Sequence, residues 1–258
     1  MRAAMRIALT AACLVLLDEP SALPRSLEAI EVSGTLALCA HPNALPFASR
    51  RGDVPGFQVE IAEALAARLG VTLTRHWVIN KFQYRRAGCD LVLDAIADEA
   101  ALAEAGLRMS RPYHRSGVRL AVRDESSVSS LAGLGPGQRI GVQVGSIAAM
   151  TLNKRGIETS PFVFEDEILD ALATREIEAA AITPAAIGWF NLKHPGARLR
   201  RIDAFENDPN LNWNVGVGMV SPDERLRQRV DAVLEALLAD GTIARIYARY
   251  GIELRAPE

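Results

Sequence analysis

One acidic residue stands inside an apolar run in the first half of the chain. Asp94 interrupts the segment Leu91-Val92-Leu93-Asp94-Ala95-Ile96 near its end. A buried carboxylate without a partner is costly, so we expect Asp94 to have a polar partner or to face a ligand-binding cleft. A carboxyl group in such a place is also a candidate general acid or base.

Two further segments could contact a ligand through backbone or aromatic groups. Gly145 and Ser146 follow a predicted strand and open a predicted helix, so their N–H groups could face a ligand oxygen. Ser146 could equally be an ordinary N-cap, and both interpretations stay open. Phe47, which follows Pro46, could cover a ligand or pack in the core.

Three arginines share one side of an extended segment. Arg111, Arg115 and Arg119 are four residues apart, and an even spacing puts strand side chains on one face. They form either a solvated edge or a set of polar contacts at a cleft.

The sequence lacks the motifs of metal and serine-hydrolase chemistry. Its four histidines are dispersed without metal-ligand spacing, and it has no Gly-x-Ser-x-Gly elbow. Gly133, Gly135 and Gly137 precede a predicted strand and do not join a strand to a helix, so they indicate a loop. We therefore expect neither a metal site nor a serine hydrolase of that type.

The composition is typical of a soluble globular protein. Of the 258 residues, 49% are apolar and 23% are charged, which excludes a disordered chain, a disulfide scaffold and a polytopic membrane protein. The net charge is −2, so the chain lacks the basic footprint that nucleic-acid binding usually leaves.

Predicted strands and helices alternate along the chain, which indicates parallel sheets flanked by helices. The alternation restarts after the Ser- and Gly-rich segment 124–137, so we predict a linker there and two α/β lobes. Ligands of such sheets bind beyond the carboxyl ends of the strands. The predicted strand ends place one set of residues in a common cleft: Asn43, Phe47, Asp94, Gln143, Gly145, Ser146 and Thr183.

Residues 1–22 have the pattern of a secretory signal peptide. Arg2 and Arg6 precede the apolar run 7–17, which is too short to span a bilayer. A buried N-terminal helix is the alternative. Removal of this segment would leave Cys39 and Cys89, which in an oxidising compartment could form a disulfide or stay as two buried thiols.

The sequence resembles the type 2 periplasmic solute-binding proteins in seven segments that follow one another in the same order: 36–47, 56–70, 89–96, 110–113, 139–146, 176–183 and 240–243. The resemblance implies a periplasmic α/β protein of two lobes, each a mostly parallel sheet flanked by helices. Two crossover strands near 119–123 and 213–217 would join a first lobe, 34–121 and 214–258, to a second, 122–213. A ligand would lie between the lobes and be enclosed by hinge motion.

The amino-acid-binding members of that family hold their ligand by two charged groups that this sequence lacks. They carry a Thr-x-x-Arg-type segment after the strand here numbered 90–96, and its arginine clamps the ligand carboxylate. Residues 98–103 contain no arginine. Those members also carry an acidic residue near Thr183 that holds the ligand ammonium, where this sequence has Thr-Pro-Ala-Ala. Ordinary amino-acid capture is therefore not expected.

Four motifs indicate a narrower group: Cys39-Ala40-x-Pro42-Asn43-x-Leu45-Pro46-Phe47, Gly56-Phe57, Gly88-Cys89-Asp90 and Arg111-Pro112-Tyr113-His114-Arg115-Ser116. They are similar to those of the quinoprotein-dehydrogenase-associated J proteins of methanol oxidation operons, and the last motif adds Tyr113 and Arg115 to the predicted cleft. If Cys39 and Cys89 lie at opposite ends of neighbouring parallel strands, their Cα atoms would exceed the usual disulfide reach of about 7 Å.

These resemblances imply a non-catalytic binding protein with no metal and no cofactor as the main expectation. Three alternative functions follow, of which only the last is enzymatic. The first is an accessory protein of a periplasmic PQQ-dependent methanol or alcohol dehydrogenase, which would bind the enzyme, its cytochrome or a small ligand. The second is the substrate-binding receptor of an ABC importer for a small polar solute, with an ABC permease as partner. The third is a dehydratase-type enzyme, with Asp94 as its acid–base residue. We expect no nucleic-acid partner and no membrane span in the mature chain.

Overall fold

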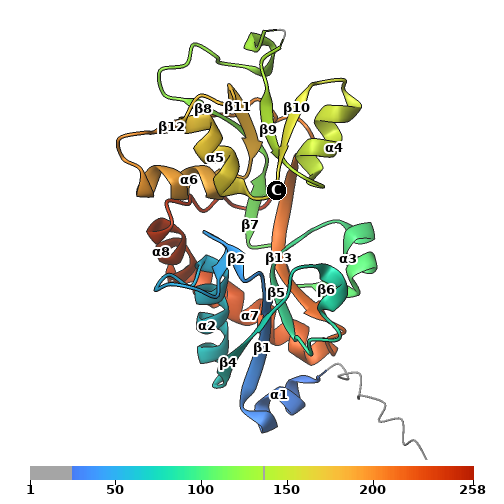
Figure 1. The fold of residues 1–258 in the computed structure, drawn as a ribbon. Helices are drawn as coiled ribbons and strands as arrows, with labels where there is room; N and C mark the ends of the chain where they lie inside the picture. Colours follow the sequence, from blue (N-terminus) through green and yellow to red (C-terminus); the bar gives the residue numbers. More distant parts are fainter. Residues whose placement is uncertain (1–24, 136) are drawn as a thin grey trace, which may run out of the picture.

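The chain folds into two lobes, one stacked on the other (Figure 1). The computed structural model describes residues 25–135 and 137–258, so the predicted signal peptide, 1–22, lies outside the described residues. Each lobe has one main sheet with helices against it, which confirms the predicted two-lobed α/β fold. None of the helices in the described ranges combines the length and the hydrophobicity that a bilayer crossing requires.

The first lobe is built on a six-stranded sheet of order β4-β1-β5-β13-β6, with β7 also paired to β13. Its strands are β1 (Thr35–Ala40), β4 (Thr72–Trp77), β5 (Leu91–Ile96), β6 (Leu107–Met109), β7 (His114–Gly117) and β13 (Asn212–Val220), with a small hairpin of β2 (Asn43–Ala44) and β3 (Ala48–Ser49). Its helices are α1 (Leu27–Ser33), α2 (Phe57–Leu69), α3 (Glu99–Ala105), α7 (Glu224–Ala239), α8 (Thr242–Arg249) and the 3₁₀ turn η1 (Lys81–Gln83).

The second lobe is built on a five-stranded sheet of order β10-β9-β11-β8-β12. Its elements are β8 (Arg119–Arg123), η2 (Leu131–Gly133), β9 (Ile140–Gln143), α4 (Ile147–Lys154), β10 (Thr159–Phe162), α5 (Glu165–Ala173), β11 (Ala179–Ile182), α6 (Pro184–Lys193) and β12 (Leu199–Ile202). Both sheets are mixed, where mostly parallel sheets were expected. The strands next to the lobe crossings, β8 and β13, run antiparallel to their neighbours.

The chain crosses between the lobes at two adjacent points. The first crossing is at Gly117–Val118, between β7 and β8, and the second is where Leu211 leads into β13. The Val118 N–H donates to the Leu211 carbonyl at 2.8 Å, so the two crossing segments lie side by side. The segment 119–123, expected as a crossover, is instead β8 within the second sheet. The segment 124–137, expected as a linker, joins β8 to β9 inside the second lobe.

Side-chain periodicity explains how the second lobe fills two cores. Successive strand side chains point to opposite faces of a sheet. Along β8, Leu120 and Val122 pack in one core cluster, whereas Ala121 packs in the other. Along β11, Ala180 and Ile182 join the same cluster as Ala121. One short apolar run therefore serves both faces of the sheet.

Candidate ligand-binding site

Three of the cavities between the lobes lie at the carboxyl ends of strands from both sheets. The central pocket, about 200 Å³ in volume, lies between Asp94 of the first lobe and Thr183 of the second. The β2–α5 pocket, about 220 Å³, is lined by β2 and the first turn of α5. The α3–α4 cavity, about 700 Å³, lies between those two helices. Ligands of open α/β sheets bind at this edge.

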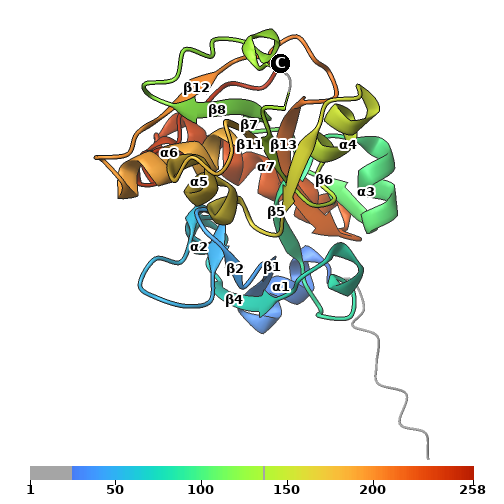
Figure 2. The same ribbon diagram turned by 45° about the horizontal axis from the view of Figure 1, so that its top comes forward.

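Helices α5 and α6 of the second lobe lie over β2 and α2 of the first in both views (Figures 1 and 2). The central pocket beneath them is mostly apolar and aromatic. The Phe57 ring lies 5.1 Å from that of Phe47 and 5.2 Å from that of Tyr247. The pocket lining is Phe47, Phe57, Gln58, Asp94, Ile96, His114, Ser116, Thr183, Ala185, Trp213, Val215, Tyr247 and Ile252.

Asp94 places its carboxylate in the central pocket between two neutral donors. Gln58 Nε2 donates to Oδ2 at 2.9 Å, and the Tyr113 hydroxyl donates to Oδ1. The backbone φ of Asp94 is +55°, a left-handed conformation that is uncommon outside glycine and clusters at functional sites. Burial raises the pKa of Asp94, and the two hydrogen bonds offset part of that rise.

Glu165 contributes a second partly buried carboxylate from the other lobe. It stands in the first turn of α5 and accepts hydrogen bonds from the Thr183 N–H at 3.0 Å and the Thr183 hydroxyl at 2.9 Å. Burial raises the pKa of Glu165 to about 6, although the bonds from Thr183 lower it in part. Glu165 therefore titrates close to neutral pH in the β2–α5 pocket.

His114 is buried at the back of the central pocket and carries no charge near neutral pH. Burial lowers its pKa to about 4, and its Nδ1 accepts the Arg255 N–H at 3.1 Å. The Arg115 N–H donates in turn to the Arg255 carbonyl at 3.0 Å. The chain segment around Arg255 is thereby fixed against β7, at the junction of the lobes.

Five of the predicted cleft residues line the two smaller pockets. Asp94 and Thr183 line the central pocket, Asn43 and Gln143 line the β2–α5 pocket, and Phe47 lines both. These five residues come from both lobes, so they could contact one ligand together.

The other four predicted cleft residues lie elsewhere. Tyr113 is 1% exposed and reaches the pocket only through Asp94. Arg115 lines the α3–α4 cavity and forms an ion pair with Glu258 at 3.1 Å. Gly145 and Ser146 are not among the lining residues of the three described cavities. Ser146 instead caps α4 by accepting the Ala149 N–H at 3.1 Å.

The arginines that were expected to share one side are separated in the structure. Arg111 is exposed and bonds to Glu235 at 3.1 Å, whereas Arg119 is 1% exposed and bonds to Asn212 at 2.8 Å. The chain leaves the first sheet between Arg115 and Arg119, so the strand periodicity does not continue from one to the other.

Glu165 is the main site residue that the sequence pattern did not indicate. An acidic residue in the first turn of a helix is a common stabilising feature, so its type and place suggested no ligand. The neighbouring Glu167 does fill that ordinary role, accepting the N–H groups of Val163 and Phe164 at 3.2 Å. Glu165 differs because Thr183, from another part of the chain, donates two hydrogen bonds to it. The sequence pattern does not reveal such a tertiary contact.

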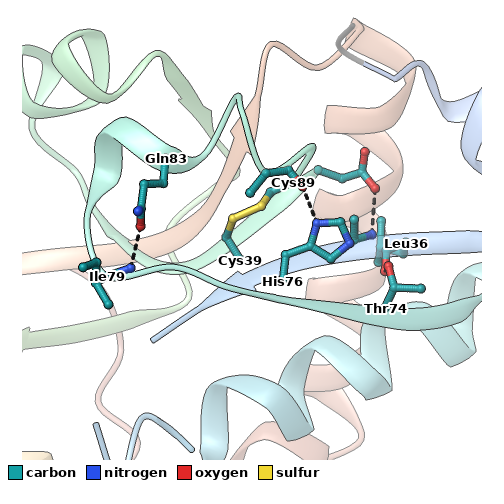
Figure 3. The surroundings of a disulfide bond; sticks show 10 residues. Leu36, Cys39, Thr74, His76, Ile79, Gln83 and Cys89 are labelled. Atoms are coloured by element: carbon teal, nitrogen blue, oxygen red, sulfur yellow. Dashed lines mark hydrogen bonds between the residues drawn. A yellow bond between two sulfur atoms is a disulfide. The ribbon is translucent and has the colours of Figure 1, made fainter. Parts of the chain in front are cut away.

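Cys39 and Cys89 form a disulfide bond with a Cα–Cα distance of 5.5 Å (Figure 3). Cys39 lies near the end of β1, whereas Cys89 lies in the turn before β5 and so beside β1. The two residues therefore do not lie at opposite ends of neighbouring strands, and of the two alternatives left open by the sequence the structure has the disulfide. His76 lies beside the bond and contacts the Ala87 carbonyl through Nδ1.

Two α/β lobes, adjacent double crossings and cavities between the lobes define a two-lobed solute-binding protein. The chain belongs to the bacterial extracellular solute-binding proteins, family 3, whose family model matches residues 36–253.

Known proteins are similar to this chain in sequence or in fold. The histidine-binding periplasmic protein of Salmonella typhimurium is 24% identical over 221 residues, which cover 81% of this chain and 84% of that protein. An ancestral cationic amino acid solute-binding protein, AncCDT-1, superposes with a TM-score of 0.73 at 19% identity, covering 87% of this chain and 99% of that one. The L-arginine-bound amino acid ABC transporter substrate-binding protein AbpA of Streptococcus pneumoniae gives a TM-score of 0.68 at 20% identity, covering 88% and 99%.

Proposed function

We propose that the protein is the periplasmic receptor of an ABC importer and holds a small solute between its lobes. The observation that carries the proposal is the central pocket, to which both lobes contribute polar groups through Asp94 and Thr183. A solute that touches both would favour the approach of the lobes. AbpA, which has the same fold, is a substrate-binding protein of an amino acid ABC transporter. The disulfide supports a location in an oxidising compartment.

The pocket size supports a small solute. Drug-sized ligands occupy sites of roughly 300–1,000 Å³. The central and β2–α5 pockets have volumes of about 200 and 220 Å³, so each suits part of a small metabolite.

Thermal unfolding against a panel of small solutes tests the proposal. Because a ligand that binds only the folded state raises stability with its concentration, a true solute will raise Tm progressively. Small-angle X-ray scattering on the same sample should show a smaller radius of gyration as the lobes approach. A panel of amines, sugars, amino acids and organic acids with no rise in Tm would overturn the receptor function.

A receptor of this kind binds its solute and releases it chemically unchanged. Asp94 and Glu165 are carboxyl groups with raised pKa, which a dehydratase could also use. The proton NMR spectrum of any bound solute, recorded before and after long incubation with the protein, tests this point. New resonances would favour the enzymatic alternative.

A second candidate is the accessory role beside a PQQ-dependent dehydrogenase or its cytochrome. The Cys39–Cys89 bond, which belongs to the motifs that resemble the J proteins, favours it. Ile79, which follows β4, is 67% exposed, and Phe82, in the 3₁₀ turn η1, is 73% exposed. Val78, next to Ile79, packs in one cluster with Cys39 and Cys89. Affinity capture with a periplasmic quinoprotein dehydrogenase tests this role. Retention that a Phe82→Ser variant loses would support it, and no retention by the wild type would reject it.

A further inference from the structure

The carboxylates of Asp94 and Glu165 differ from other shielded carboxylates of this protein in the charge of their partners. Asp90 and Asp208 each form an ion pair with an arginine, Arg25 and Arg155 respectively. The hydrogen-bond donors to Asp94 and Glu165 are neutral groups of glutamine, tyrosine and threonine. Within the described ranges, neither carboxylate has an arginine or lysine at salt-bridge distance.

The two carboxylates face connected parts of the cleft. Phe47 lines both the central pocket and the β2–α5 pocket. Thr183 lines the central pocket, and its hydroxyl donates to Glu165 at 2.9 Å. A solute in the central pocket beside Asp94 therefore lies next to the group that holds Glu165.

We propose that the cleft takes a small organic cation that has no carboxylate group, such as an alkyl amine or guanidine, and that Asp94 and Glu165 supply its counter-charge. This inference rests on the receptor function proposed above and names the chemical class of the solute.

The walls of the central pocket suit the rest of such a ligand. Phe47, Phe57 and Trp213 present aromatic rings next to Asp94. Aromatic faces attract cations, and their apolar area would cover an alkyl chain.

The charge pattern disfavours a zwitterion. Neither the central nor the β2–α5 pocket has an arginine or lysine among its lining residues. His114 is neutral because burial lowers its pKa to about 4. Cationic residues line two neighbouring cavities instead. Arg115, Lys154 and Arg155 line the α3–α4 cavity, which shares Ile96 and Trp213 with the central pocket. A cavity of about 460 Å³ beside α6 shares His114 and Ile252 with it and is lined by Arg115, Arg198, Arg200, Arg201 and Arg255. Inside the central and β2–α5 pockets, the carboxylate of an amino acid would thus meet two like charges and no counter-charge, a repulsive element that gives specificity.

Isothermal titration with matched probes tests the inference. The pairs are agmatine with arginine and cadaverine with lysine, which differ by the α-carboxylate, and choline with its neutral isostere 3,3-dimethylbutan-1-ol. We expect at least one cation to bind roughly tenfold or more tightly than its partner, since one ionic contact is worth over 1.4 kcal/mol. An amino acid or a neutral isostere that binds as tightly as every cation would overturn the cation class. It would leave the receptor function intact, whereas failure of a broad solute panel would overturn both.

Two variants assign the counter-charge to residues. Glu165→Gln and Asp94→Asn should each weaken cation binding about tenfold, and should weaken binding of the neutral isostere less than that. Asp170→Asn is the matched control for Glu165→Gln, because Asp170 is exposed on the same helix and lines none of the described pockets. If Asp94→Asn fails to fold, Glu165→Gln alone tests whether the carboxylates supply the counter-charge. Unchanged cation affinity in a folded Glu165→Gln protein would contradict the assigned role of Glu165.

Discussion

Gly188 of α6 and Gly251 after α8 bring the backbones of the two lobes into direct contact. A Cβ atom built on Gly188 would lie 2.1 Å from the Gly251 carbonyl oxygen. Beside this contact the ring centroids of Trp189 and Tyr250 are 5.5 Å apart. The glycines therefore set how closely the second lobe approaches the first, next to the central pocket.

Substitution Gly188→Ala tests this contact. Alanine normally stabilises a helix relative to glycine by about 1 kcal/mol. Here the added methyl group must push α6 away from Gly251, so we expect the free energy of unfolding to fall by about 1–3 kcal/mol and solute affinity to fall with it. Urea denaturation and titration measure the two effects. Gly196→Ala is the control, because nothing lies within 4 Å of the added atom. A more stable Gly188→Ala protein would show that the lobes do not meet there.

The pH dependence of stability should reveal Glu165. Its folded-state pKa, about 6, exceeds its ordinary value of 4.5, so the folded protein holds this proton more tightly. The associated stability is fully present below about pH 4.5 and is lost as the pH rises through about 6. The groups that face Glu165 are Thr183, Asp166 and His41 of the same pocket.

We therefore expect Glu165→Gln to gain stability relative to the wild type between pH 5 and 7.5, by up to about 2 kcal/mol. The measurement is the difference between the unfolding free energies of the two proteins at each pH in that range. The difference removes the contributions of titratable groups that both proteins share. A difference that does not change with pH would mean that Glu165 titrates normally.

Tyr113 should act as a positioning residue for Asp94. Its hydroxyl bond lowers the pKa of Asp94 against the effect of burial. Tyr113→Phe removes that donor, so Asp94 should ionise at higher pH and the rise of cation affinity with pH should move to higher pH. Titration calorimetry at several pH values measures this shift. A Tyr113→Phe protein with lower affinity but an unchanged pH profile would indicate a packing role alone.

The disulfide should contribute substantially to the stability of the first lobe. Cys39 and Cys89 are 50 residues apart in sequence. The entropy of closing a loop of about 50 residues corresponds to about 4 kcal/mol, which is an upper estimate for a double Cys→Ser variant. Urea denaturation of that variant and of the oxidised wild type gives the comparison. Equal stabilities would show that the bond is absent or that the unfolded chain is already compact.

The sequence predicted those features that depend on local pattern. Asp94 was singled out by the cost of a carboxylate in an apolar strand, and Thr183 by its place at a strand end before a helix. Features that depend on contacts between distant segments of the chain could not be predicted from it. The lobe crossing at Gly117 lies inside one continuous extended run of sequence. Glycine is required there because the second crossing segment passes close by: a Cβ on Gly117 would lie 2.4 Å from the Leu211 carbonyl oxygen. The site role of Glu165 likewise depends on Thr183.

The most direct test of the account is a crystal structure with a bound solute. Crystals grown with the tightest-binding cation of the titration series, for example agmatine, should show it in the central pocket, in contact with both Asp94 and Thr183. Density for the solute in the α3–α4 cavity or on the outer surface, with the central pocket free of it, would contradict the claim that the two lobes hold the solute together.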